Sequence, residues 1–200
     1  MTGQAAATGY PAPVASGTAS GSTSTEGAGA GAGDDGPTPF DRLRRRVLWA
    51  FPSGLYLLGS RAGERRNLMT LSWATQVAMD PKLVAVSVER EALTAELIAS
   101  GGVFSISLLR REDRVVVRRF AKPAADDPEA GTLAGHPVRA ARTGAPILAA
   151  ALAWVDCEVR HALELGSHTL FVGEVVDCGA AGEDLDGVLR MEDTRMSYGG

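Results

Sequence analysis

The chain has 200 residues, of which 45% are hydrophobic, and its formal net charge is −4 at pH 7. This length and composition suffice for one ordinary domain with its own core. The small negative charge argues against nucleic-acid binding. No apolar run approaches the length of a membrane span, so we expect no membrane partner and a cytoplasmic location.

Residues 1–37 differ in kind from the rest of the chain. Nine Gly, nine Ala and nine Ser or Thr make up 27 of these 37 residues, and Lys and Arg are absent. Such a segment cannot bury enough surface to offset its ordering entropy, so it predicts a flexible tail. It lacks the basic and leucine-rich regions of a secretory signal. Residues 31–36 match the G-x-G-x-x-G pattern, but that pattern indicates dinucleotide binding only between a strand and a helix.

The domain is expected to occupy residues 38–200, beginning with a helix. Thr38 is a typical N-cap, Pro39 suits the first helical position, and Asp41 lies near the positive end of the helix dipole. The apolar residues of this helix form one stripe, and its arginines leave the other sides basic. The stripe contains Phe40, Leu43, Val47 and Leu48, and the arginines are Arg42, Arg44, Arg45 and Arg46.

Residues 67–109 predict strands around one short helix. Residues 67–79 mix β-branched, aromatic and hydroxyl side chains, which predicts a strand ended by the turn signal Asp80-Pro81. Residues 82–88 are apolar at both alternating sets of positions, as in a strand covered on both faces. Helical spacing follows until Ser100-Gly101-Gly102, a typical helix stop. Further strands are expected at residues 55–60 and 103–109.

A positive charge and a hydroxyl group flank the expected start of this short helix. Arg90 ends the preceding strand, and Thr94 lies one turn into the helix. Backbone N–H groups at a helix start lack partners and attract anions. The pattern indicates either an anion site made by Arg90 and Thr94, or a solvated arginine and a threonine that bonds only to backbone.

Polar and apolar side chains alternate just before that site. Amide and hydroxyl groups at Asn67, Thr70 and Ser72 suit the polar edge of a planar ligand. Met69 and Trp73 suit its apolar faces, although Trp73 is also compatible with a core position.

The C-terminal half contains a clear hairpin. Residues 112–120 predict a helix or, at their three valines, a strand fragment, and residues 121–134 predict a loop bordering the site. Residues 154–165 and 168–178 alternate as strands, and Gly166-Ser167 suits a two-residue turn. With Leu165 opposite His168, an unbroken register would place Cys157 opposite Val176.

The two cysteines are expected to be reduced core residues. In the unbroken register Cys157 is a diagonal neighbour of Cys178, about 7 to 8 Å away by backbone, which is too far for an unstrained disulfide. No C-x-x-C spacing occurs, and the histidines at 136, 161 and 168 are scattered. We therefore expect no metal site.

The segments NLMTLSWATQVAMDPKLVAVSVE and LTAELIASGGVFSISLL, with HTLFVGEVVD and the closing Tyr198-Gly199-Gly200, resemble the flavin reductase family over roughly residues 45–200. This resemblance implies a mainly β fold with peripheral helices, the homodimeric FMN-binding split β-barrel. Residues matching 67–73, Leu71 among them, would line the isoalloxazine ring and ribityl chain. Residues matching 90–94 would hold the phosphate, although relatives often have a serine where Ala92 stands.

The same resemblance implies an NAD(P)H-dependent flavin reductase. NADH or NADPH would reduce FMN, FAD or riboflavin, and a partner monooxygenase would receive the reduced flavin. His168 is the candidate catalytic residue, because relatives carry a similar histidine near the nicotinamide, and the alternative is an exposed turn histidine. Tyr198 would pack over the ring or dock on the barrel. Two other functions stay open: reduction of ferric iron or a quinone, and non-catalytic flavin or haem binding.

Overall fold

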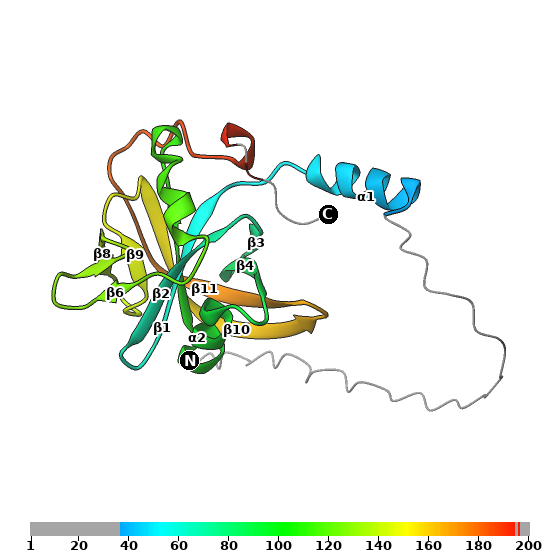
Figure 1. Cartoon of the computed structure of the whole chain (residues 1–200). Helices are drawn as coiled ribbons and strands as arrows, with labels where there is room; N and C mark the ends of the chain where they lie inside the picture. Colours follow the sequence, from blue (N-terminus) through cyan, green and yellow to red (C-terminus); the bar gives the residue numbers. More distant parts are fainter. Residues whose placement is uncertain (1–36, 195, 197–200) are drawn as a thin grey trace, which may run out of the picture. The chain divides into compact units, whose positions relative to one another are not determined.

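The computed structural model describes residues 37–194 and residue 196. The described residues form one compact unit, and both the tail predicted for residues 1–37 (apart from Pro37) and Tyr198 lie outside them. The helical elements are α1 (Pro39–Trp49), α2 (Leu93–Gly101) and the 3-10 turns η1 (Arg111–Asp113), η2 (Val116–Phe120) and η3 (Met191–Asp193). The strands are β1 (Tyr56–Ala62), β2 (Arg65–Leu71), β3 (Ala74–Met79), β4 (Lys82–Glu89), β5 (Val103–Leu108), β6 (Asp126–Asp127), β7 (Thr132–Leu133), β8 (His136–Ala140), β9 (Pro146–Leu148), β10 (Ala153–Leu165) and β11 (His168–Ala180) (Figure 1).

A seven-stranded antiparallel sheet forms the body of the domain. Its strand order is β2-β1-β5-β10-β11-β4-β3. The strands at its two edges, β2 and β3, are joined by only two residues, Ser72 and Trp73. A sheet whose edges are so connected has to curl until they approach each other, which produces a split barrel. The predicted mainly β split barrel is therefore confirmed.

A small four-stranded sheet, β6-β7-β8-β9, packs beside the barrel. Two hydroxyl groups of β5 bind it: Ser105 Oγ donates to the Pro146 carbonyl at 2.7 Å, and Leu148 N–H donates to Ser107 Oγ at 3.1 Å. Apolar side chains fill two clusters. One lies under α2 and includes Ile98 and Phe104, and the other includes Leu68 and Phe120 beside η2 and β7.

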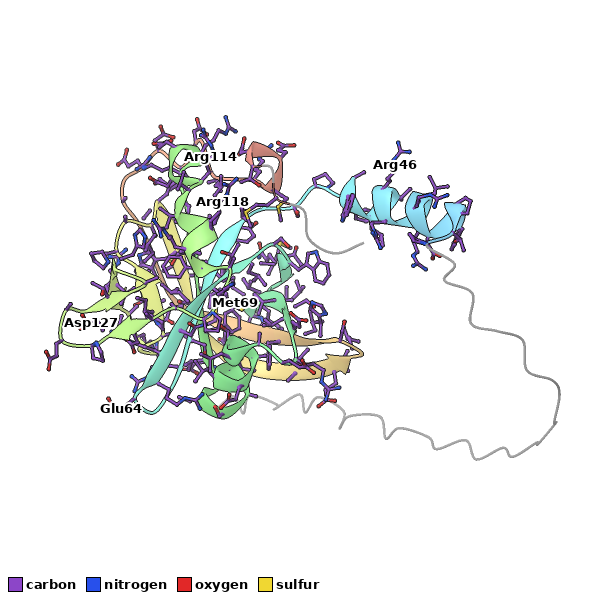
Figure 2. All side chains as sticks on the ribbon, viewed as in Figure 1. Arg46, Glu64, Met69, Arg114, Arg118 and Asp127 are labelled. Atoms are coloured by element: carbon purple, nitrogen blue, oxygen red, sulfur yellow. The ribbon has the colours of Figure 1, made fainter. Side chains whose placement is uncertain are left out.

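Helix α1 begins as its sequence predicts, but its apolar stripe is exposed. Thr38 Oγ1 accepts from Asp41 N–H while the Asp41 carboxylate accepts from Thr38 N–H, a complete capping box. None of the residues of α1 is buried, and the four residues of its apolar stripe are 47% to 68% exposed (Figure 2 draws the side chains). The local signals therefore establish the helix without establishing a packing partner for it.

Two expected elements differ from the structure. The single strand predicted over residues 67–79 is divided into β2 and β3 at Ser72-Trp73, because the chain crosses there from one sheet edge to the other. The helix or strand predicted over residues 112–120 is instead the pair of 3-10 turns η1 and η2. Within η2, Val117 and Phe120 are buried three residues apart, which matches the three-residue repeat of a 3-10 turn.

The β10–β11 hairpin has the predicted turn but a different register farther from it. Leu165 pairs with His168, and Gly166 has a φ of 58°, a conformation that suits glycine. Irregularities near residues 156–157 and 159–161 then shift the pairing, so Cys157 lies opposite Val175 rather than Val176. Both thiols are free, but only Cys157 is buried. Cys178 is exposed, so its predicted core position is wrong.

Candidate functional site

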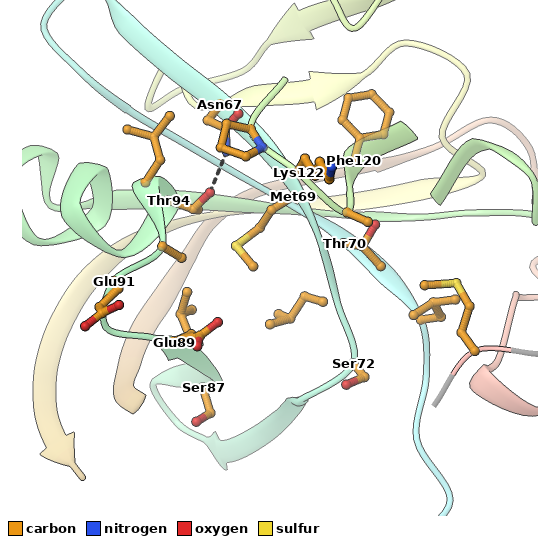
Figure 3. A pocket seen from close by; sticks show the side chains of 18 of the residues that line it. Asn67, Met69, Thr70, Ser72, Ser87, Glu89, Glu91, Thr94, Phe120 and Lys122 are labelled. Atoms are coloured by element: carbon orange, nitrogen blue, oxygen red, sulfur yellow. Dashed lines mark hydrogen bonds between the residues drawn. The ribbon is translucent and has the colours of Figure 1, made fainter. Parts of the chain in front are cut away.

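A cavity of about 430 Å³ opens between the edge strand β2 and the end of β4. This volume lies within the range of small-molecule sites. Its wall comes from β2, the end of β4, the first turn of α2 and the segment after η2 (Figure 3). Six of the nine predicted site residues line it: Asn67, Met69, Thr70, Leu71, Ser72 and Thr94.

Asn67 connects three parts of this wall. Its side chain is buried, Nδ2 donates to Thr94 Oγ1 at 2.8 Å, and Oδ1 accepts from the Ala124 N–H at 2.9 Å (Figure 3 draws the first bond). A buried carboxamide needs such partners, because leaving one unpaired costs about 1 to 3 kcal/mol. Asn67 therefore fastens β2 to both α2 and the segment that follows η2.

Thr70 and Thr94 also use their hydroxyl groups within the protein. Thr70 Oγ1 donates to the Val117 carbonyl of η2, and Thr94, only 1% exposed, accepts from Asn67. Both side chains line the cavity while holding its wall together. Their hydrogen bonds identify a structural role that residue type alone does not reveal.

Ser72 is different, because its hydroxyl group is buried without a partner. The residue is 6% exposed, and within residues 37–194 and 196 no group forms a hydrogen bond to Ser72 Oγ. Buried hydroxyl groups nearly always have a partner in native proteins. Since Ser72 lines the cavity at the end of β2 (Figure 3), a polar atom of a bound molecule is the partner that the geometry favours.

The first turn of α2 adds unpaired backbone donors. Ala92 is the N-cap and makes no side-chain capping bond, because its methyl group has no hydrogen-bonding atom. The first N–H groups of a helix have no acceptor within the helix, and the helix dipole makes this end positive. The Ala92 N–H donates to the Glu89 carbonyl at 3.0 Å, but Leu93 and Thr94 also line the cavity, so the N–H groups of these two residues lie at its wall.

Arg90 is not brought to the cavity. Its neighbours Glu89 and Glu91 line the cavity, but β4 ends at Glu89, and Arg90 lies in the turn before α2, where the Ala92 N–H donates to the Glu89 carbonyl at 3.0 Å. The Arg90 guanidinium lies beside the β10–β11 turn, with Nη2 3.2 Å from the Glu164 carboxylate and Nη1 3.5 Å from the Gly166 carbonyl. The structure places Thr94 at the predicted anion site and Arg90 in a separate hollow between α2 and the hairpin.

Trp73 and His168 lie together just beyond the cavity. Their ring centroids are 4.9 Å apart with the planes inclined by 46°. Trp73 is 38% exposed, and its carbonyl accepts from the N–H of Ser87, a cavity residue. His168 pairs with Glu89, another cavity residue, across β11 and β4. The two aromatic rings thus form a partly exposed surface beside the cavity, joined to it by β4.

Sequence reasoning missed the part of the wall that comes from distant segments. Residues 121–134 were expected to border the site, and three of them line it, but nothing singled out a particular side chain. The additional lining residues include Phe120, Lys122, Met191 and Met196. Met191 and Met196 come from the C-terminal segment, whose local sequence carries no signal for a ligand site.

Residues 37–194 and 196 contain no group of three or more His, Cys, Asp or Glu side chains arranged to hold a metal ion. In the same residues, no helix has the length and apolar character needed to span a bilayer.

Residues 48–199 match the family model of the flavin reductase like domain. The chain belongs to this family. It is 32% identical over 136 residues to the NADH-dependent flavin reductase StyB of Pseudomonas fluorescens, a match that covers 68% of this chain and 76% of that protein. It is 31% identical to the putative diflavin flavoprotein A 1 of a Nostoc species, but spans only 24% of that longer protein.

A solved structure supports the same assignment. The styrene monooxygenase flavin reductase from Pseudomonas putida S12 matches with a TM-score of 0.59 and 32% identity, over 70% of this chain and 87% of that one. Family membership and fold therefore agree with the resemblance seen in the sequence. The cavity described above lies within residues 48–199, the range that the family model matches.

Proposed function

We propose that this protein is an NAD(P)H-dependent flavin reductase that binds FMN in the cavity beside β2 and α2. The unpaired, buried hydroxyl group of Ser72 carries the proposal, because it marks a place for a polar ligand atom inside a largely apolar cavity. The name of the relative StyB as an NADH-dependent flavin reductase supports the activity.

The cavity residues have the chemistry that a flavin needs. Met69 and Leu71 offer apolar contact to a flat ring, and Ser72 offers a hydroxyl group to its polar edge. The first turn of α2, at Leu93 and Thr94, offers N–H groups to a phosphate. Asn67 and Thr70 would act indirectly, because their hydrogen bonds hold the wall in place.

When bound, the flavin itself supplies the hydride chemistry, so the protein needs to bind and orient the two reactants. His168 and Trp73 are the proposed positioning pair for the nicotinamide, because their partly exposed rings lie beside the cavity. Holding the nicotinamide close to the flavin converts a bimolecular encounter into a reaction between oriented neighbours. His168 would thus contribute to the second substrate and not to flavin binding.

Two further features belong to the proposal. A partner monooxygenase would receive the reduced flavin, as the name of the styrene monooxygenase reductase supports. The protein would act as a homodimer, and the exposed apolar stripe of α1, which includes Phe40 and Val47, is consistent with a surface that a partner covers.

Spectroscopy and steady-state kinetics test the function. The absorption spectrum of the purified protein shows which chromophore copurifies. Oxidation of NADH and of NADPH is then followed with FMN, FAD or riboflavin as acceptor, against reactions without protein. We expect flavin-dependent oxidation of at least one nucleotide. A protein that binds flavin but oxidises neither nucleotide would be a carrier or sensor, and oxidation only with ferric iron or a quinone would indicate another acceptor.

A further inference from the structure

Lys122 is the cationic side chain of the cavity wall. Among the described residues that line the cavity, it is the only Lys or Arg. No salt bridge involves Lys122 in the described part of the chain, whereas Arg90 is paired with Glu164. Its ammonium group is therefore available to a negatively charged ligand in the cavity.

Two hydrogen bonds connect the backbone near Lys122 to the first turn of α2. Ala124 N–H, two residues after Lys122, donates to Asn67 Oδ1 at 2.9 Å, and Asn67 Nδ2 donates to Thr94 Oγ1 at 2.8 Å. Phe120, two residues before Lys122, is 1% exposed and anchors the other side. The chain that carries Lys122 is thus fixed to the same end of the cavity as the N-terminus of α2 (Figure 3).

An anion bound near the first turn of α2 would need a positively charged side chain beside it. Glu89 and Glu91 also line the cavity, and their carboxylates repel an anion. The partial positive charge of the α2 N-terminus is equivalent to only about half an elementary charge. Arg90 is paired with Glu164 outside the cavity. Among the described lining residues, Lys122 is therefore the one that can place a full positive charge beside a phosphate.

We propose that Lys122 is the specificity residue that favours phosphorylated flavins, with its ammonium group paired to the phosphate held at the first turn of α2. This inference rests on the proposed function, that the cavity binds a flavin. Ser72 supplies the independent sign of a ligand, since its unpaired hydroxyl group lies in the same cavity. FMN and FAD carry a phosphate for Lys122, and riboflavin does not.

Binding of FMN and riboflavin to three variants tests the inference. Lys122→Ala removes the charge, Lys122→Arg keeps it, and Arg90→Ala removes a nearby charge that points away from the cavity. Kd values are measured by quenching of flavin fluorescence at one fixed ionic strength. Charge-assisted hydrogen bonds are the stronger class, so Lys122→Ala should weaken FMN binding on the order of tenfold to a hundredfold. Riboflavin binding should stay within about twofold, because the interaction lost involves only the phosphate.

The controls separate the inference from the function on which it rests. Lys122→Arg should restore most of the FMN affinity, and Arg90→Ala should change both Kd values by less than about twofold. An unchanged ratio of FMN to riboflavin affinity in Lys122→Ala overturns the inference while flavin binding itself stands. A selective loss of FMN binding in Arg90→Ala also overturns it. Wild-type protein that binds neither flavin overturns the proposed function and the inference together.

Discussion

Two sides of the cavity use their polar side chains in opposite ways. On the bonded wall, formed by Asn67, Thr70 and Thr94, each polar group is hydrogen-bonded to another part of the protein. The side chains of two other lining residues, buried Ser72 at the end of β2 and exposed Lys122 after η2, form no hydrogen bond or salt bridge with a described group. Polar lining residues thus divide into those that hold the cavity in shape and those available to a ligand. Substitutions on the two sides should therefore affect different quantities.

The largest effect on stability is expected on the bonded wall. Asn67→Ala leaves the Thr94 hydroxyl and the Ala124 N–H without their partner. The free energy of unfolding should fall by roughly 2 to 5 kcal/mol, since each buried group left unpaired costs about 1 to 3 kcal/mol. Urea denaturation of the purified variant measures the change, with exposed Thr75→Ala as the control. A loss below about 1 kcal/mol would mean that water replaces the carboxamide and that the wall is not closed.

The next effect concerns the aromatic pair Trp73 and His168 beside the cavity. His168→Ala should slow flavin reduction by NADH or NADPH, with a loss of roughly 1 to 3 kcal/mol in transition-state stabilisation if one hydrogen bond is removed. Flavin affinity should change little. Stopped-flow reduction at several nucleotide concentrations measures the rate, and His161→Ala in the same hairpin is the comparison. Identical traces for wild type and His168→Ala would leave His168 as a turn residue.

A smaller effect is expected at Ser72. Ser72→Ala removes a buried hydroxyl group that has no partner in the described protein, so the free energy of unfolding should stay the same or rise slightly. Flavin binding should weaken by roughly threefold to tenfold, the loss of one neutral hydrogen bond of about 1 kcal/mol. Denaturation and fluorescence titration of one preparation give both numbers. A destabilised variant with unchanged flavin affinity would move Ser72 to the bonded wall.

The smallest effect concerns the reactivity of the two cysteine thiols, one buried and one exposed, which both lie away from the cavity. Burial, aided by nearby Asp156, raises the pKa of the Cys157 thiol to about 12, whereas Cys178 is exposed. At pH 8 the thiolate fraction of Cys157 is then roughly one in 10⁴, so a thiol reagent should label Cys178 alone in the folded protein. Mass spectrometry counts the labels, and Cys178→Ser should remove them. Rapid labelling of Cys157 under native conditions would show that the barrel opens.

Local patterns predicted much of the fold because their causes are local. The capping box at Thr38 and Asp41 and the turn at Gly166 need only neighbouring residues to form, and both are present. The hairpin irregularities are different. Their position depends on packing against other strands, such as the close approach of Gly173 to Phe104 of β5, which no alternation within the hairpin reveals.

The candidate site was predicted less completely than the fold, because it depends on contacts between distant segments. The positions of Asn67 to Ser72 along one strand placed them at one site, but their sequence did not show which of them would be hydrogen-bonded to distant groups. Arg90 was expected at the anion site because strand and helix meet there, but it lies in the turn after β4, and its guanidinium is paired with Glu164 of the hairpin. Lys122 carries no local signal, because its place depends on a hydrogen bond between segments 57 residues apart.

The hydrogen bonds of Asn67 also bear on how a ligand leaves the cavity. The segment carrying Lys122 is attached to Oδ1 of this side chain and helix α2 to its Nδ2, so a single buried carboxamide joins two separate parts of the wall. Lifting either part for release would break one bond and leave a buried polar atom unpaired, at about 1 to 3 kcal/mol. If the proposed flavin leaves as a product, Asn67 would therefore influence the rate of its release, a step that limits turnover in many enzymes.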